Sequence, residues 1–169
     1  LTIPDTLIDY PVMYHPEEVN YYLKRDFFRE YSANGSLFLS ENCSLKDCDN
    51  LIIYGHHMNS GKMFAALEGY LERKFFKEHP FIFFNTLQGE EKYQVFAVFS
   101  TPVYTGSDFA YYTFTKAENR KSYETFIEAV KERSFYDTGI TADYGEKLLT
   151  LSTCEYSQEN GRLVVVAKK

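Results

Sequence analysis

Short apolar runs rich in Val, Ile, Phe and Tyr recur along the chain and alternate with polar, turn-forming segments. Runs of about four to eight residues with β-branched and aromatic side chains are typical of strands. The sequence therefore predicts about eight strands, at residues 8–14, 36–39, 51–54, 81–84, 93–100, 109–114, 148–153 and 163–167.

Two segments instead carry apolar residues with helical spacing. An apolar residue recurs at every fourth position across residues 63–75, and residues 123–130 follow the i, i+3, i+4, i+7 pattern of a helix with one buried face. Thr115 and Glu118, ahead of the second stripe, have the spacing of a capping box. A third, shorter helix is predicted over residues 16–28, with Pro16 in its first turn.

Together these elements predict a mostly β protein. The most economical architecture is a closed or nearly closed β-barrel of about eight strands with two or three peripheral helices. Because the chain contains no internal repeat and no Pro/Gly/Ser-rich linker, we expect residues 1–169 to form a single domain.

Charge and composition exclude some classes of protein. Eighteen basic residues against 24 acidic residues give a net charge of −6, so the chain lacks the basic surface that a nucleic-acid-binding protein needs. No apolar run approaches the length of a membrane-spanning helix. Residue 1 is Leu rather than Met, from which we expect a mature or trimmed form that lacks any membrane anchor.

The last two predicted strands carry the first candidate for chemistry. When the first is extended to Cys154 and the second begins at Arg162, seven residues, 155–161, separate them, and they predict an antiparallel hairpin with Cys154 opposite Arg162 at its mouth. Directly opposed residues have Cβ atoms about 4.5 to 5.5 Å apart. A thiol beside a guanidinium ionises more readily and becomes a better nucleophile, so Cys154 is a candidate catalytic residue.

A cysteine nucleophile also needs a proton donor, most often His. His56 and His57 follow the predicted strand 51–54, and if that strand is parallel to the Cys154 strand, their ends meet at the same rim. Adjacent residues of an extended chain point to opposite faces, so only one of the two can serve Cys154. For the same reason the pair is a poor metal site, and we expect no metal. From these residues alone, purely structural roles for Cys154, Arg162 and the histidines also remain possible.

Two motifs resemble a known family. The segment Thr150-Leu-Ser-Thr-Cys154, followed by Arg162 and a Val-rich strand, is similar to the signature of the sortases, the cysteine transpeptidases of Gram-positive surfaces. Ile53-Tyr-Gly-His-His-Met58 matches the family's His motif, and its double His with Lys62-Met-Phe64 resembles class B sortases in particular. A long helix over residues 118–133 is similar to one in class B members. The resemblance runs from about residue 7 to residue 169.

The resemblance implies a sortase-like barrel and a class B type transpeptidase without a cofactor. In that family's reaction the cysteine attacks the Thr carbonyl of a C-terminal sorting signal of the Leu-Pro-x-Thr-Gly or Asn-Pro-x-Thr-Gly/Asn kind. An amine of a peptidoglycan cross-bridge, or a pilin Lys, then resolves the thioacyl enzyme. The resemblance also implies a location at the extracellular face of the plasma membrane of a Gram-positive bacterium.

The resemblance assigns site residues as follows. Cys154 is the nucleophile, His56 the acid and base, and Arg162 the oxyanion donor together with the backbone N–H of Glu155, whereas His57 packs or faces solvent. Further positions expected beside the substrate are Tyr54, Ser152, Tyr111, Ser107, Asn20 and Leu23.

Other interpretations remain. Papain-like peptidases place Cys ahead of His, the reverse of this chain, and chymotrypsin-like cysteine peptidases carry the nucleophile in a glycine-flanked loop. A hydrolytic sortase-fold peptidase and a non-catalytic, aromatic-rich β-module that binds cell-wall glycan or peptide are the two alternatives. Cys43 and Cys48 lie outside the family pattern, and an oxidising exterior would permit a disulfide between them.

Overall fold

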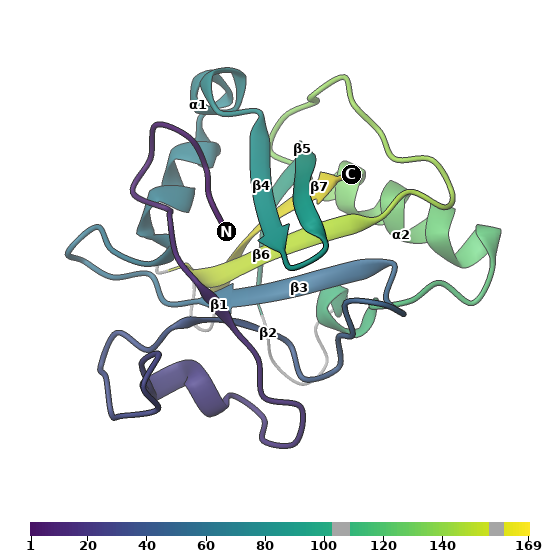
Figure 1. The fold of residues 1–169 in the computed structure, drawn as a ribbon. Helices are drawn as coiled ribbons and strands as arrows, with labels where there is room; N and C mark the ends of the chain where they lie inside the picture. Colours follow the sequence, from purple (N-terminus) through teal and green to yellow (C-terminus); the bar gives the residue numbers. More distant parts are fainter. Residues whose placement is uncertain (103–108, 156–160) are drawn as a thin grey trace.

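The computed structural model describes residues 1–102, 109–155 and 161–169, and for Cys154 and Glu155 it describes the backbone alone. Within these residues seven strands form one curled sheet with the spatial order β1-β2-β3-β6-β7-β5-β4 (Figure 1). The strands are β1 (Val12–Met13), β2 (Leu37–Leu39), β3 (Asn50–Gly55), β4 (Phe81–Thr86), β5 (Gly89–Pro102), β6 (Leu148–Glu155) and β7 (Gly161–Lys168). The prediction of a mostly β fold is confirmed, with seven strands among the described residues instead of eight.

The strand predicted over residues 109–114 is wrong. Tyr111–Thr113 form a 3-10 helix, η3, and the neighbouring aromatic rings pack in the core. The Phe114 ring stacks on Phe126 with centroids 4.0 Å apart, and Tyr111 meets Phe99 edge-on at 6.1 Å. This continuous aromatic run therefore serves packing and not strand pairing.

The sheet forms a half-barrel and not a fully closed barrel. β1 and β4 are its two edges, and β1 is only two residues long, so it pairs with β2 alone. The N-terminal segment crosses between these edges, because Thr2 and Phe83 exchange two backbone hydrogen bonds of 2.8 Å each. Among the described residues, Thr2 and Phe83 form the only β-bridge between the N-terminal segment and β4.

The predicted helix over residues 16–28 is shorter than expected, and the one over residues 63–75 is divided into two. Residues 16–28 contain only the 3-10 helix η1 (Tyr21–Lys24), preceded by Asn20 in the left-handed conformation. Residues 63–75 divide at the extended Glu72 into the 3-10 helix η2 (Phe64–Leu71) and α1 (Arg73–Glu78). A Cβ at Gly69 would lie 2.6 Å from the Phe75 ring, so this glycine permits the chain to fold back on itself.

The long helix α2 spans Arg120–Arg133 and buries Tyr123, Phe126, Ile127 and Val130, as the spacing predicts. Its capping box is formed by Asn119 and Ser122, so the predicted box at Thr115 and Glu118 is wrong. The Thr115 carbonyl instead accepts the backbone N–H groups of Asp49 and Asn50, at 2.8 and 3.0 Å. No helix in the described part of the chain is both long and apolar enough to span a membrane.

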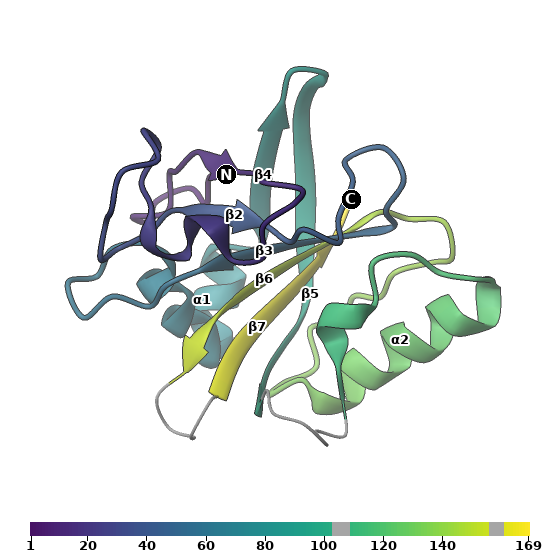
Figure 2. The same cartoon turned by 90° about the horizontal axis from the view of Figure 1, so that it is seen from below.

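Strands β6 and β7 divide the core into two clusters, because alternate residues point to opposite faces. One face, which includes Leu149, Leu151 and Val165, packs inside the half-barrel. The opposite face, with Leu148 and Val164, packs against α2 and the aromatic residues beside it. Figure 2 shows β3, β6 and β7 side by side, with α2 to one side of them and α1 to the other.

Candidate active site

Three neighbouring strands bring the predicted catalytic positions together at one end of the sheet. β6 pairs with β7 in antiparallel register, and Cys154 lies directly opposite Arg162, as the hairpin prediction requires. β3 runs parallel to β6, with Tyr54 beside Ser152 and Gly55 beside Thr153. Both strands therefore end at the same rim, as predicted.

Alternation along these strands places the three positions on one face. Tyr54, Ser152 and Val164 occupy one cross-strand row. The next residues on that face are His56, just beyond the end of β3, with Cys154 on β6 and Arg162 on β7. Since neighbouring strands lie about 4.8 Å apart, the backbone of this row spans only about 10 Å.

Hydrogen bonds fix both the side chain and the backbone of His56. Its Nε2 lies 2.7 Å from the Leu23 carbonyl oxygen, and because a carbonyl only accepts, Nε2–H is the donor. The His56 carbonyl accepts the backbone N–H of Phe64 at 2.9 Å. A Cβ at Gly55 would lie 2.4 Å from the Leu37 side chain, so a glycine is required immediately before this histidine.

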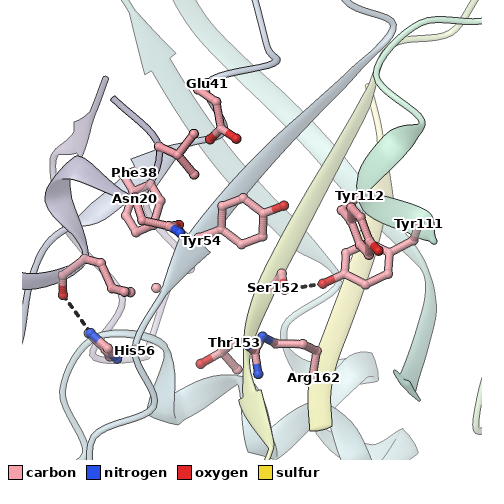
Figure 3. Close-up of a pocket in the computed structure, with 13 residues that line it drawn as sticks. Asn20, Phe38, Glu41, Tyr54, His56, Tyr111, Tyr112, Ser152, Thr153 and Arg162 are labelled. Carbon is pink, nitrogen blue, oxygen red and sulfur yellow. Dashed lines mark hydrogen bonds between the residues drawn. The ribbon is translucent and has the colours of Figure 1, made fainter. Parts of the chain in front are cut away.

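His56 and Arg162 line a cleft that also contains five of the predicted substrate positions (Figure 3). These five are Asn20, Leu23, Tyr54, Tyr111 and Ser152. Asn20 and Leu23 come from η1 and the residue before it, whereas the others come from the sheet and from η3. Residues that lie near opposite ends of the sequence therefore line the same cleft.

Uncharged hydroxyl groups and aromatic rings form one wall of the cleft. The Tyr111 and Ser152 hydroxyls are hydrogen bonded at 2.7 Å, and both side chains are buried. Burial, reinforced by the nearby Tyr111, raises the pKa of the Tyr54 phenol well above its usual range, so Tyr54 stays neutral. Phe38 packs against it with ring centroids 5.6 Å apart. These uncharged hydroxyls and rings can contact a peptide without attracting a charged group.

His57 points away from the cleft, in agreement with the prediction that only one of the two histidines faces it. The His57 side chain is 9% exposed, and its Nε2 lies 2.8 Å from a carboxylate oxygen of Glu68. His57 is absent from the cleft lining, whereas His56 is part of it. This placement is consistent with the expectation that His57 packs against the protein outside the cleft.

Sequence reasoning missed six lining residues of the cleft: Val19, Phe38, Glu41, Gly55, Tyr112 and Thr153. A signal existed for Thr153, which precedes Cys154 in the sequence, whereas Phe38 comes beside Tyr54 only through the register of β2 with β3. No signal existed for Val19 or Glu41, because the conformation of their loops follows from tertiary contacts. Of the predicted positions, Ser107 lies outside the described residues, and so do the side chains of Cys154 and Glu155.

The other two cysteines have a different environment. Cys43 and Cys48 are both buried free thiols, so the disulfide that an oxidising exterior would permit is not formed. Burial raises the pKa of the Cys43 thiol to about 12, and the neighbouring Cys48 reinforces the shift. A protonated, buried thiol is a poor nucleophile. In the described part of the chain, no group of three or more His, Cys, Asp or Glu side chains is placed to hold a metal ion.

Comparisons with known proteins agree with this geometry. The family model described as "Sortase domain" matches residues 1–169. Sortase B of Staphylococcus aureus and sortase B of Listeria monocytogenes are each 34% identical over 171 residues, which is 99% of this chain and 68% and 67% of the respective relatives. A solved S. aureus sortase B-substrate complex has a TM-score of 0.89 at 34% identity, covering 99% of this chain and 76% of that one. A sortase B solved in complex with triglycine has a TM-score of 0.88 at 34% identity, with coverage of 99% and 77%.

The chain belongs to the sortase family. Its relatives are class B sortases, as the motifs predict, and they indicate that this chain is a sortase-type cysteine transpeptidase. The fold is accordingly the sortase fold, and the non-catalytic binding module is no longer a competing interpretation.

Proposed function

We propose that this protein cleaves a C-terminal sorting signal after its Thr and transfers the new carboxyl end to an amine. The observation that supports this most directly is the cross-strand register that sets Cys154 opposite Arg162, one row beyond Tyr54 and Ser152 on the same face. Relatives of known structure have been solved as a substrate complex and with triglycine, and these ligands suggest the two substrates of such an exchange.

In the first half-reaction the Cys154 thiolate adds to the Thr carbonyl carbon. The carbonyl oxygen becomes an oxyanion, which then collapses as the C–N bond to the following residue breaks. His56 gives its proton to the departing amine, and a thioacyl enzyme remains. In the second half-reaction His56 takes a proton from the incoming amine, whose nitrogen forms the new amide as the thiolate leaves. One amide is exchanged for another without an external oxidant, reductant or cofactor.

Arg162 has the role of oxyanion donor in this proposal, together with the backbone N–H of Glu155. The opposed register puts the guanidinium stem beside Cys154, where charge develops on the carbonyl oxygen. The Arg162 Nη1 donates to the Gly161 carbonyl at 3.0 Å, which restricts the swing of the side chain. In the same way, the hydrogen bond from His56 to the Leu23 carbonyl fixes the orientation of the imidazole ring.

The sorting signal is proposed to lie along the cleft, against Asn20, Leu23, Tyr54, Tyr111 and Ser152. These positions offer one amide, three hydroxyls and apolar walls, which suits an uncharged extended peptide. On the family resemblance, Ser107 is proposed as a further residue beside the sorting signal.

The acceptor is proposed to be an amine of a peptidoglycan cross-bridge or a pilin Lys. With such substrates the enzyme is proposed to act at the extracellular face of the plasma membrane of a Gram-positive bacterium. The net charge of −6 supports a role that involves no nucleic acid.

A peptide exchange assay tests the function. The protein is incubated with a fluorescent peptide that contains Asn-Pro-Ala-Thr-Gly, with and without triglycine, and products are identified by mass spectrometry. We expect a product joined through Thr to triglycine, and no such product from Cys154→Ala. Release of the free Thr acid alone, at all triglycine concentrations, would instead indicate a hydrolase.

A further inference from the structure

Charge is distributed unevenly along the cleft. Among the lining residues that the structure describes, His56 and Arg162 are the basic ones and Glu41 is the only carboxylate. Figure 3 shows Glu41 at the end opposite to His56 and Arg162, with the Tyr54 ring between them. An extended peptide in the cleft would therefore meet a basic end and an acidic end.

Strand register gives the length of this arrangement. Leu39 on β2 is level with Ile53 on β3, which is level with Leu151 on β6. Cys154 lies three residues further along β6, about 10 Å at 3.3 Å per residue. β2 runs in the opposite direction, and Glu41 lies two residues past Leu39, which adds up to about 7 Å.

The two sites are separated by about 10 to 17 Å along the strands. Since β3 lies between β2 and β6, they are also about 10 Å apart across the sheet, which makes about 14 to 20 Å in all, or four to six residues of extended peptide. If the N-terminal part of the signal points toward Glu41 and the scissile Thr lies at Cys154, the residue that reaches Glu41 lies about four to six positions before that Thr. In a pentapeptide signal this corresponds to the residues just ahead of the signal, and a long Lys or Arg side chain on its first residue also comes within reach.

The Glu41 carboxylate is partly exposed and is only weakly engaged by its neighbours. The Asn42 side-chain amide donates a long hydrogen bond of 3.4 Å to it. No ion pair among the described residues includes Glu41. Its charge acts within the cleft, because it adds to the effects of burial and of Tyr111 in raising the pKa of the Tyr54 phenol.

We infer that Glu41 is a specificity-determining residue that selects a Lys or Arg side chain at, or just ahead of, the first residue of the sorting signal. This inference rests on the proposed function, because that function puts the scissile bond at Cys154. A carboxylate half in water attracts a cation only modestly, so the preference over an uncharged residue is expected to be about two- to fivefold. Exchanging the cation for an anion adds repulsion, and the expected ratio of Lys to Glu peptides is about three- to tenfold.

The test uses acetylated peptides with two variable positions followed by Pro-Ala-Thr-Gly-amide. Lys, Gln or Glu is placed at either variable position, with Asn at the other. The kcat/KM for acylation of Cys154 is measured for the wild type, for Glu41→Gln and for Glu41→Lys. Glu78→Gln is the matched control, because Glu78 is an exposed carboxylate on α1, away from the cleft lining.

The wild type and the control should prefer the Lys peptide, mainly through a lower KM. The ratio of kcat/KM for the Lys peptide to that for the Glu peptide should fall at about 0.5 M salt, because the ion pair between Glu41 and the peptide Lys is partly exposed. Glu41→Gln should bring the ratio of Lys to Glu peptides close to one, and Glu41→Lys should reverse it. A wild-type ratio of one, or a ratio that persists in Glu41→Gln, would overturn the inference and leave the transpeptidase proposal intact.

A second measurement separates the two proposals. If no peptide acylates Cys154, the proposed reaction fails, and the same comparison is made on the dissociation constants of the peptides for Cys154→Ala. If Cys154→Ala binds the Lys peptides more tightly than the others, and the double variant Cys154→Ala/Glu41→Gln does not, selection by Glu41 is supported independently of the chemistry. Equal binding of the Lys, Gln and Glu peptides would overturn it.

Discussion

The two faces of the β6–β7 hairpin differ in what they contribute. The face inside the half-barrel is apolar at Leu149, Leu151, Leu163 and Val165, with Leu151 paired to Val165, and Thr153 near the cleft is its polar exception. The opposite face is apolar only where α2 covers it, at Leu148 and Val164, and it becomes polar toward its end. One hairpin thus provides core packing on one face and candidate chemistry at the end of the other. Changes at the polar end should reduce activity with little loss of stability, and changes on the inner face should do the reverse.

The largest effect is expected at His56. His56→Gln should lower the exchange rate by about 10² to 10⁴, because it removes the proposed acid and base. His57→Gln is the matched control, since this neighbour contacts Glu68 outside the cleft, and its loss should be far smaller. Rates are compared at equal folded concentration, checked by circular dichroism. Equal losses in the two variants would contradict the assignment of roles to the two faces.

Arg162→Ala should slow acylation by about 10² to 10³, the typical cost of removing one oxyanion donor. Arg162→Lys should recover part of this loss, because it retains the charge but not the geometry of the guanidinium. The measurement is the single-turnover rate of thioacyl formation, with thermal unfolding recorded in parallel. Near-normal acylation by Arg162→Ala would count against a role for this side chain in the reaction.

Val165→Ala tests the inner face. Val165 is fully buried and pairs with Leu151, so loss of two methyl groups should destabilise the fold by about 2 to 3 kcal/mol. Urea unfolding measures this cost, and activity per folded molecule should stay close to that of the wild type. A variant with unchanged stability and reduced turnover would show that the two faces are not separable.

The smallest expected effect is on stability and concerns Asp49, which precedes β3 and contacts Lys147 before β6 and Ala117 before α2. Burial of Asp49 opposes its ionisation, but hydrogen bonds from Lys147 and from the Ala117 N–H, at 2.8 and 3.0 Å, outweigh it and hold its pKa below the ordinary value of 3.8. A lowered folded-state pKa stabilises the protein above the unfolded pKa, and this contribution is lost as the pH falls below it. Asp49→Asn should cost about 1 kcal/mol at pH 7.

Urea unfolding at pH 7 and near pH 3 measures the difference between the wild type and Asp49→Asn. The difference should shrink at the lower pH, because the Asp49 carboxylate of the unfolded chain, which has the higher pKa, takes up a proton first and so favours unfolding. A difference that is independent of pH would mean that the Asp49 charge does not contribute.

The sequence contains enough information for the sheet and the rim, but not for the loops. Alternation and hairpin spacing predict that Cys154 faces Arg162, because register is determined by the strands themselves. The far wall of the cleft depends on contacts between distant segments, such as the hydrogen bond from the Ser36 N–H to the Tyr22 carbonyl, which no local pattern encodes. For this reason Glu41 and Val19 could not be predicted. The aromatic-rich residues 109–114 were predicted as a strand, although Tyr111–Thr113 form a 3-10 helix.

The central claim is that one thiol, at the end of β6, carries the reaction. Mass spectrometry of the intact protein after incubation with sorting peptide and no amine tests it most directly, followed by peptide mapping of the three cysteines. The account predicts a single thioacyl adduct at Cys154, with Cys43 and Cys48 unmodified, and no adduct in folded Cys154→Ala. An adduct at another residue, or amide exchange by Cys154→Ala at the wild-type rate, would contradict it.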